Sequence, residues 1–154
     1  TANAAVETVT EKASYREPIK TKRCLVPADG FYEWRTEGAN KYPYFIHLLE
    51  EEIFSFAGIY DEWVNKSTGE IVQSFSILTT EANDLMAKIH NTKKRMPIIL
   101  NEDLEKRWLT DEPLPGLLSE AAQPFPTQLM VAHTISKSFL RMPNGPEKQL
   151  PFEC

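Results

Sequence analysis

The segment RCLVPADGFYEWR, at residues 23–35, places a single glutamate, Glu33, among large aromatic side chains. Side chains alternate between the two faces of a β-strand, so Glu33 should share one face with Phe31. Tyr32 and Trp34 should share the other face. A carboxylate beside an aromatic ring is partly stripped of water and holds a proton more readily, as general acid–base catalysis requires. The alternative is a carboxylate at a strand edge that pairs with a lysine or an arginine.

Three histidines could take part in such chemistry. His90 lies at the end of a predicted helix, where the helix dipole favours an imidazolium, and the alternative is a solvated histidine. His47 and His133 lie in predicted strands, where a hydrogen-bonded histidine of the core or the sheet edge is the simpler interpretation. The histidines and cysteines match none of the usual metal-ligand spacings, so neither a metal site nor a cofactor is expected.

Basic side chains form two clusters in the sequence, Lys20, Lys22 and Arg23 and then Lys93, Lys94 and Arg95. Solvated surface charge is the simplest interpretation of each cluster. The second cluster follows His90 directly, so a phosphate group bound there would lie near that imidazole. The aromatic residues around Glu33 could stack on the bases of a single strand, although such residues more often belong to the core.

Length and composition favour one domain over residues 1–154. With 42% hydrophobic and 25% charged residues, the chain resembles an ordinary globular protein. A net charge of −5 argues against binding of duplex DNA through a uniformly basic surface, but it allows a local basic groove. Cys24 and Cys154 are too few for a disulfide framework, and no apolar run is long enough to span a membrane. We therefore expect a cytoplasmic protein.

Turn and cap signals predict the elements that would position these residues. The segment from Thr8 to Glu11 matches a capping box, so we expect a helix over 8–16 that Pro18 ends. Asp29-Gly30 is a strong hairpin signal between two apolar runs. Strands are expected at 23–28, 31–36, 44–49 (after Pro43), 53–64, 71–79, 96–100 and 128–134, and those at 53–64 and 71–79 should form a second hairpin.

Helices are expected in the second half of the chain, over 81–89, 102–109 and 116–122. Asn101 should cap the second of these, with Leu104, Trp108 and Leu109 turned inward. The pattern is typical of an α+β fold, mainly an antiparallel curved sheet or a partly closed β-barrel with a few short helices.

Four motifs follow one another along the chain: NAAVET, ADGFYEW, IHN…RMPIIL and AHTIS. In this order they resemble the SOS-response-associated peptidase (SRAP) family, and the resemblance covers most of the chain. It implies a protein that senses abasic sites in single-stranded DNA and shields them by a covalent DNA–protein crosslink. We expect a monomer, associated with the nucleoid when it acts, with neither membrane nor metal as a partner.

The resemblance also implies roles for individual residues. Glu33 and His90 look like the family's catalytic glutamate and histidine, and Asn3 looks like the asparagine of its active-site pocket. Family members begin Met-Cys-Gly-Arg, and self-removal of the methionine frees the amine and the thiol of the cysteine. The amine condenses with the aldehyde of the open sugar, and the thiol closes a thiazolidine ring. His90 would then protonate the ring oxygen of the sugar, and Glu33 would move protons at the amine and the imine.

The sequence departs from the family pattern at three places. It begins at Thr1 without Met-Cys-Gly-Arg, so we expect a fragment that lacks the N-terminal segment and is inactive by itself. Ala5 replaces the family's arginine, which would remove a phosphate contact. Residues 91–94 lengthen the connection between the histidine and the Arg-Met-Pro segment, and the added lysines would replace that contact.

Two other functions stay open at this point. A non-catalytic module would bind single-stranded DNA without covalent capture. A hydrolase would use Thr1 as an N-terminal nucleophile. Cys24 and Cys154 do not match the position of the family's nucleophile, and Cys24 should be inert at the start of a core strand.

Overall fold

The computed structural model describes residues 3–152, and Thr1 and Cys154 lie outside the described residues. The chain forms two compact units, each assembled from three stretches: unit 1 from 1–27, 55–81 and 97–125, and unit 2 from 28–54, 82–96 and 126–154. The expectation of one domain over residues 1–154 stays a prediction. Within residues 3–152, no helix is both long and apolar enough to cross a membrane.

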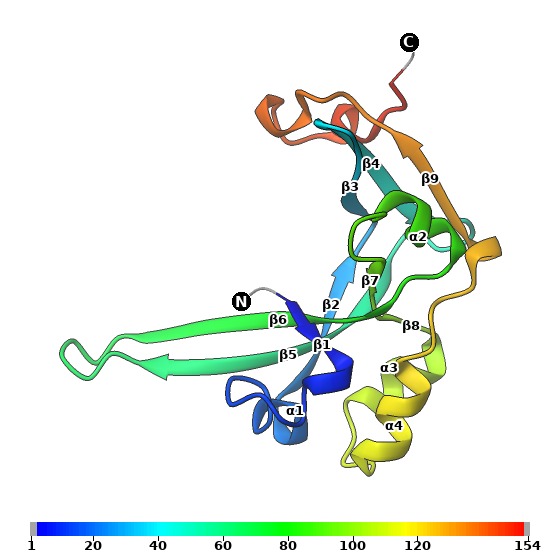
Figure 1. The fold of residues 1–154 in the computed structure, drawn as a ribbon. Helices are drawn as coiled ribbons and strands as arrows, with labels where there is room; N and C mark the ends of the chain where they lie inside the picture. The colour runs from blue at the N-terminus through cyan, green and yellow to red at the C-terminus, as the bar shows by residue number, and fades with distance from the viewer. Residues whose placement is uncertain (1–2, 153–154) are drawn as a thin grey trace. The chain divides into compact units, whose positions relative to one another are not determined.

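The sheet of unit 1 is built around a long antiparallel ribbon (Figure 1). Its strands are β1 (Asn3–Ala5), β2 (Arg23–Ala28), β5 (Phe54–Val64), β6 (Ile71–Glu81) and β8 (Ile99–Leu100). The order is β1-β6-β5-β2, β8 pairs with β5, and β1 runs parallel to β6. The predicted hairpin of 53–64 and 71–79 is confirmed as β5 and β6, which pair from Gly58 and Ile77 to Val64 and Ile71.

The helices of unit 1 cover a buried core. They are α1 (Pro18–Thr21), α3 (Glu102–Trp108), α4 (Leu114–Ala121) and a 3-10 turn at Val6–Thr8. The core residues are Ala4, Val9, Tyr15, Ile19, Ala57, Ile59, Leu78, Ile98, Leu100, Leu104, Trp108, Leu117 and Ala121.

The cap of α3 was predicted correctly, because the Asn101 carboxamide accepts the backbone N–H of Leu104 at 2.8 Å. Trp108 is fully buried and donates its indole N–H to the carbonyl of Gly58 at 3.0 Å. The inward placement of Leu109 was wrong: it is 57% exposed, because the helix ends at Trp108.

The predicted helix over 8–16 was also wrong. The chain there makes a 3-10 turn at Val6–Thr8 and then a series of turns. Pro18 begins α1 instead of ending a helix, since a proline at the first helical position gives up an N–H that has no helical partner. The capping-box pattern was therefore an unreliable helix signal in a segment this short.

Unit 2 contains a three-stranded antiparallel sheet in the order β3-β4-β9. The strands are β3 (Phe31–Glu37), β4 (Asn40–Leu48) and β9 (Met130–Thr134). One helix, α2 (Asp84–Ile89), contacts β3, and short 3-10 turns lie at Thr127–Leu129, Phe139–Arg141 and Pro146–Gln149. The chain returns to unit 1 within the short strand β7 (Arg95–Pro97).

The two faces of β3 have different roles. Tyr32 and Trp34 pack against the small core of unit 2, and their rings lie 4.6 and 5.9 Å from that of Phe139. The expected alternation is therefore confirmed, and Glu33 faces the opposite side together with Phe31. Across the β3–β4 pair, Glu33 lies beside Tyr44.

The predicted hairpin at Asp29-Gly30 was wrong, because β2 pairs with β5 whereas β3 pairs with β4. The hairpin turn lies instead at Gly38, whose φ of +58° suits glycine. Gly30 is required for space, since an added Cβ would lie 2.4 Å from the ring of Phe45. The strand expected at 44–49 begins earlier, at Asn40, and carries Pro43 inside it.

The remaining elements differ from expectation mainly at their ends. The helix expected over 81–89 begins at Asp84, since β6 continues through Glu81 and Asn83 caps the helix by accepting the N–H of Met86 at 2.9 Å. The strand expected at 96–100 is split into β7 and β8. The helix expected at 116–122 is α4, and the strand at 128–134 is β9. The α+β class is confirmed.

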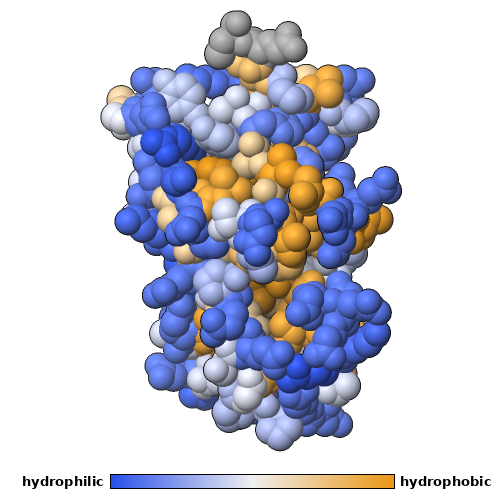
Figure 2. Space-filling model, turned by 90° about the vertical axis from the view of Figure 1, so that its right-hand side faces the viewer, coloured by the Kyte–Doolittle hydropathy of each residue, from blue (hydrophilic) through white to orange (hydrophobic). Residues whose placement is uncertain are grey.

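Some apolar side chains reach the surface, and Figure 2 shows several of them on one face among polar residues. In unit 1 they concentrate on the outer part of the β5–β6 ribbon, where the exposed residues are Tyr60, Trp63, Val64, Ile71, Val72 and Phe75.

Candidate active site

Glu33 and His90 come together in unit 2. Glu33 projects from β3, and His90 is the residue at which α2 ends. Glu33 Oε2 lies 3.6 Å from His90 Nδ1, and the two side chains are 23% and 22% exposed. A carboxylate and an imidazole are thus held in partial shelter from water, where charge interactions are stronger than in bulk solvent.

The Glu33 carboxylate is fixed by its own strand. Its other oxygen, Oε1, accepts the backbone N–H of Trp34 at 2.8 Å. Packing of the partly buried Tyr32 and Trp34 on the far face helps to hold β3 in the orientation that turns Glu33 towards α2. The carboxylate therefore has one oxygen engaged by the backbone and one oxygen directed at the imidazole.

The His90 ring is held by a backbone carbonyl. Its Nδ1 lies 3.0 Å from the carbonyl oxygen of Arg95. A carbonyl can only accept a hydrogen bond, so Nδ1 carries the proton and donates it. In the neutral ring, Nε2 is then unprotonated and able to take a proton, and in the imidazolium it is able to give one. The expected position of His90 at a helix C-terminus is confirmed, and its backbone N–H bonds to Met86 at 2.7 Å.

The basic residues Lys93, Lys94 and Arg95 follow His90 as the sequence requires. The two lysines are exposed, and Arg95 is half-buried. Lys94 has a positive φ of 50°, its N–H bonds to the His90 carbonyl at 2.8 Å, and its carbonyl accepts the N–H of Ala82 at 3.0 Å. The loop is thus closed on itself next to the imidazole. Contact of these three residues with DNA stays a prediction.

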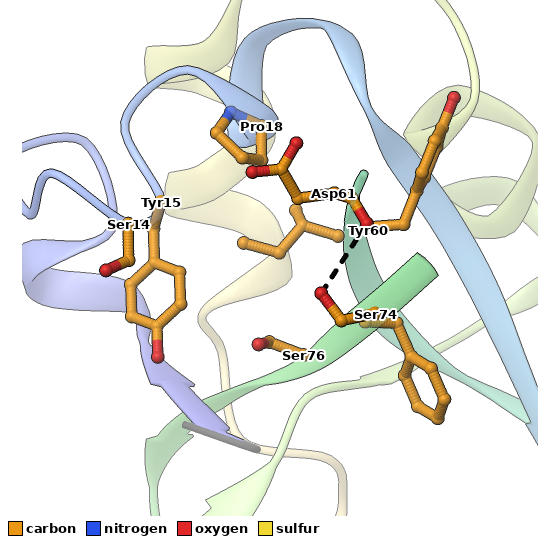
Figure 3. A pocket seen from close by; sticks show the side chains of 9 residues that line it. Ser14, Tyr15, Pro18, Tyr60, Asp61, Ser74 and Ser76 are labelled. Carbon is orange, nitrogen blue, oxygen red and sulfur yellow. Dashed lines mark hydrogen bonds between the residues drawn. The ribbon is translucent and has the colours of Figure 1, made fainter. Parts of the chain in front are cut away.

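Asn3 belongs to unit 1, whereas Glu33 and His90 belong to unit 2. It is exposed at the start of β1, beside Ile77 of β6, and its carbonyl accepts the Tyr15 hydroxyl at 3.2 Å. Tyr15 also lines a cavity of about 450 Å³ in unit 1, together with Ser14, Pro18, Ile59, Tyr60, Asp61, Ser74, Phe75 and Ser76 (Figure 3). Asn3 is therefore linked through the Tyr15 hydroxyl to a residue that lines this cavity, whose lining also includes the hydroxyl groups of Ser14, Ser74 and Ser76.

Each basic side chain of the first cluster, Lys20, Lys22 and Arg23, has a hydrogen-bond or ion-pair partner within unit 1. Lys22 binds Asp61 at 2.6 Å, and this hydrogen bond lowers the pKa of Asp61 and raises the pKa of Lys22. Lys20 pairs with Glu17 at 3.1 Å, and Arg23 donates to the carbonyl of Trp108 at 2.7 Å. All three basic side chains of this cluster therefore have partners within unit 1, beyond the solvated surface charge that the sequence suggested.

His47 and His133 are held by hydrogen bonds to backbone carbonyls, and Cys24 is partly buried. His47 Nδ1 lies 2.9 Å from the carbonyl of Leu48, and His133 Nε2 lies 2.6 Å from that of Gln149, as expected for hydrogen-bonded histidines. Cys24 is half-buried, and burial raises the pKa of its thiol, in accord with an inert residue. Between residues 3 and 152, no three His, Cys, Asp or Glu side chains are grouped as metal ligands.

Two residues near the pair were not identified as site residues from the sequence. Tyr44 lies opposite Glu33, which only the register of β3 and β4 reveals. Asn91 bonds through its side chain to the backbone of Thr36. Its place directly after His90 was the only signal in the sequence.

A family model and several curated proteins match most of this chain. The family model for "SOS response associated peptidase (SRAP)" matches residues 1–141. The abasic site processing protein YoqW of Bacillus subtilis is 39% identical over 151 residues, which are 97% of this chain and 64% of that protein. The abasic site processing protein HMCES of Gallus gallus is 39% identical over 130 residues, covering 71% of this chain and 38% of that protein.

Two solved protein structures also match the fold of this chain. A crystal structure of a protein from Bacteroides thetaiotaomicron matches with a TM-score of 0.94 and 46% identity, over 98% of this chain and 66% of that one. A protein from Bordetella bronchiseptica matches with a TM-score of 0.76 and 27% identity, over 87% of this chain and 64% of that one. The chain thus spans less than two-thirds of the length of YoqW and of both solved proteins.

Proposed function

The chain belongs to the SOS response associated peptidase family, and from this premise we propose that the protein senses abasic sites in single-stranded DNA and shields them by a covalent crosslink. The observation that carries the proposal is the Glu33–His90 pair, in which a carboxylate and an imidazole from distant parts of the sequence lie 3.6 Å apart. Such a pair supplies the acid and the base that opening and capture of a sugar aldehyde require.

The crosslink forms through an N-terminal cysteine, which these 154 residues do not contain because they begin with Thr1. Its α-amine attacks the aldehyde carbon of the open deoxyribose, water leaves, and an imine forms. The thiol sulfur then adds to the imine carbon, and the nitrogen takes the proton to complete a thiazolidine ring. The cysteine becomes terminal when the protein removes its own initiator methionine, which is the peptidase activity that we propose.

His90 acts on the closed sugar. As an imidazolium it donates the Nε2 proton to the ring oxygen while the bond from C1 to the ring oxygen breaks, and the C1 hydroxyl passes its proton to water to form the aldehyde. The aldehyde is thereby released next to the pair. The orientation of the ring supports this role, because the Arg95 carbonyl at 3.0 Å occupies Nδ1 and leaves Nε2 for the substrate.

Glu33 acts on the amine. Its carboxylate takes a proton from the ammonium group before attack, and its acid form returns a proton as water leaves the carbinolamine. One oxygen is held by the Trp34 N–H at 2.8 Å, so the carboxylate keeps one orientation through both steps. Asn3 would hydrogen-bond the amine or the sugar without adding charge, and Lys93, Lys94 and Arg95 would bind flanking phosphates.

We place this activity in the cytoplasm, at the nucleoid, and in a monomer. The test uses the intact protein with its processed cysteine terminus and a single-stranded oligonucleotide that carries one abasic site. A species that survives denaturing electrophoresis, with a mass equal to protein plus oligonucleotide minus water, is expected with the abasic strand and not with an intact strand. The 154-residue chain should bind such strands at most reversibly.

Two outcomes would overturn the proposal. Equal reversible binding of abasic and intact strands, without a covalent species, would identify a non-catalytic single-stranded DNA-binding module. A covalent adduct formed by the 154-residue chain alone would move the nucleophile to Thr1 or to a lysine.

A further inference from the structure

Asn91 joins the end of α2 to the outer edge of β3. Its Oδ1 accepts the backbone N–H of Thr36 at 3.0 Å, and its Nδ2 donates to the Thr36 carbonyl at 2.8 Å. β3 is the edge strand of its sheet, paired on one side with β4. A carboxamide carries the same donor and acceptor as a peptide group, so the Asn91 side chain pairs with Thr36 as a neighbouring strand would.

A second contact supports this junction. The Arg35 guanidinium donates to the carbonyl of Lys88 in the last turn of α2. Arg35 and Thr36 lie directly after the segment that carries Glu33, and Lys88 and Asn91 flank the segment that carries His90. The strand that carries Glu33 and the helix end that carries His90 are therefore joined by hydrogen bonds of Arg35 and Thr36, which lie close to Glu33 in the sequence.

The loop after Asn91 sets the other constraint on the His90 ring. The Lys94 N–H closes the loop on the His90 carbonyl at 2.8 Å. This closure returns Arg95 to the imidazole, where its carbonyl lies 3.0 Å from Nδ1. Glu33 Oε2 approaches the same nitrogen at 3.6 Å. The Arg95 carbonyl thus holds the proton on Nδ1, and Asn91, the first residue of the same loop, anchors that loop and the ring to β3 through Thr36.

We propose that Asn91 is a positioning residue, which clamps α2 to β3 so that His90 keeps its proton on Nδ1 beside Glu33 and presents Nε2 for proton transfer. The part of this statement that concerns substrate rests on the proposed function. The clamp itself is a property of the folded protein and can be measured without DNA.

The primary measurement is the ¹⁵N chemical shift of both His90 ring nitrogens in the intact protein, at a pH at which the ring is neutral. The unaltered protein should show a protonated Nδ1 and an unprotonated Nε2. Asn91→Ala removes both bonds to Thr36 and should shift the proton population towards Nε2, because the ring is no longer held against the Arg95 carbonyl. Asn91→Asp keeps an acceptor for the Thr36 N–H, loses the donor, and should give an intermediate shift.

Asn83→Ala is the matched control. Asn83 caps the opposite end of the same helix through the Met86 N–H at 2.9 Å, so its loss weakens α2 without touching Thr36. The His90 shifts should stay as they are in the unaltered protein. Unchanged shifts in both Asn91 variants would overturn the proposal, as would an equal change in Asn83→Ala, since the effect would then reflect helix stability alone.

A second readout links the clamp to chemistry. Asn91→Ala should slow covalent capture of abasic single strands by about tenfold to a hundredfold, because a small displacement of a catalytic group costs that much. Reversible affinity for intact single strands should be unchanged. If the unaltered protein forms no crosslink, the proposed function fails while the ¹⁵N result still decides the clamp. If crosslinking is normal in Asn91→Ala although the tautomer shifts, the positioning role is refuted.

Discussion

Glu33 Oε2 lies 3.6 Å from His90 Nδ1, which is beyond hydrogen-bonding distance, while the Arg95 carbonyl lies 3.0 Å from the same nitrogen. The carboxylate is thus a charge partner of the imidazole and not the acceptor of its proton. Under the proposed function, this arrangement would let Glu33 exchange protons with the amine while His90 exchanges protons through Nε2.

Glu33→Gln should slow crosslink formation, or its reversal, by about a hundredfold, since the amide keeps the shape but transfers no proton. The rate is measured by quenched time courses on denaturing gels with the intact protein. Reversible affinity for an intact single strand should be nearly unchanged. A rate equal to that of the unaltered protein would mean that the base lies elsewhere.

His90→Ala should slow capture most when the sugar is in its closed form, because ring opening needs a proton at the ring oxygen. A single-stranded oligonucleotide that carries a simple aldehyde in place of the abasic sugar needs no ring opening, and it serves as the control substrate. The deficit of His90→Ala should be much smaller with that control. Equal deficits with both substrates would contradict the assigned role.

The sequence predicted the local features of the site better than the pairing of its strands. Alternation along β3 placed Tyr32 and Trp34 on the core side correctly, because side-chain direction in a strand depends only on the backbone. The hairpin at Asp29-Gly30 failed because a dipeptide with a strong turn preference does not determine which distant strand each neighbour joins. The close approach of Phe45 that requires Gly30 is a tertiary contact, which no local pattern contains.

The proximity of Glu33 and His90 was expected from the family motifs and not from any spacing. A strand and a helix end meet there through Thr36 and Asn91, and such a contact between residues far apart in sequence has no local signature. The cap at Asn101, in contrast, involves residues three positions apart and was predictable. Of these two contacts, the one between residues close in sequence was predictable, and the one between distant residues was not.

Neutralising the basic loop should weaken binding of single strands. In a Lys93→Gln, Lys94→Gln, Arg95→Gln variant, the slope of log K against log salt concentration should fall by about 0.7 for each phosphate that the protein no longer neutralises. Fluorescence anisotropy across a salt series measures the slope. The exposed residues Lys12, Lys41 and Lys66, changed together to Gln, alter the net charge equally and should leave the slope unchanged. Equal slopes for the two triple variants would place the binding surface elsewhere.

Cys24 should react slowly with iodoacetamide at neutral pH. Burial raises the pKa of its thiol, so the folded state disfavours the thiolate that is the reactive form. The neutral Cys24 thiol contributes to the free energy of unfolding. This contribution is fully present below the pKa of the thiol in the unfolded chain, and it is lost as pH rises through the higher pKa of the thiol in the folded protein. Alkylation followed by mass spectrometry, in a Cys154→Ser background, should be slower than in urea at each pH. Equal rates would show that Cys24 is accessible and unperturbed.

Gly30→Ala should destabilise unit 2 and, with it, the strand that carries Glu33. The added Cβ would lie 2.4 Å from the ring of Phe45 and 2.6 Å from the carbonyl oxygen of Ile46. The ring could turn aside only by disturbing the packing of a buried aromatic, and the backbone oxygen cannot move without breaking the register of β4. Overpacking of this kind costs about 1–3 kcal/mol, which urea titration monitored by tryptophan fluorescence can resolve.

Gly116→Ala provides the matched control for that measurement. Gly116 lies in α4, and nothing comes within 4 Å of a Cβ placed there. Alanine in a helix is favoured over glycine by about 1 kcal/mol, so this variant should be slightly more stable than the unaltered protein. The two glycine substitutions should therefore change the free energy of unfolding in opposite directions. A neutral or stabilising effect of Gly30→Ala would show that the approach of Phe45 and β4 to Gly30 is looser than these distances imply.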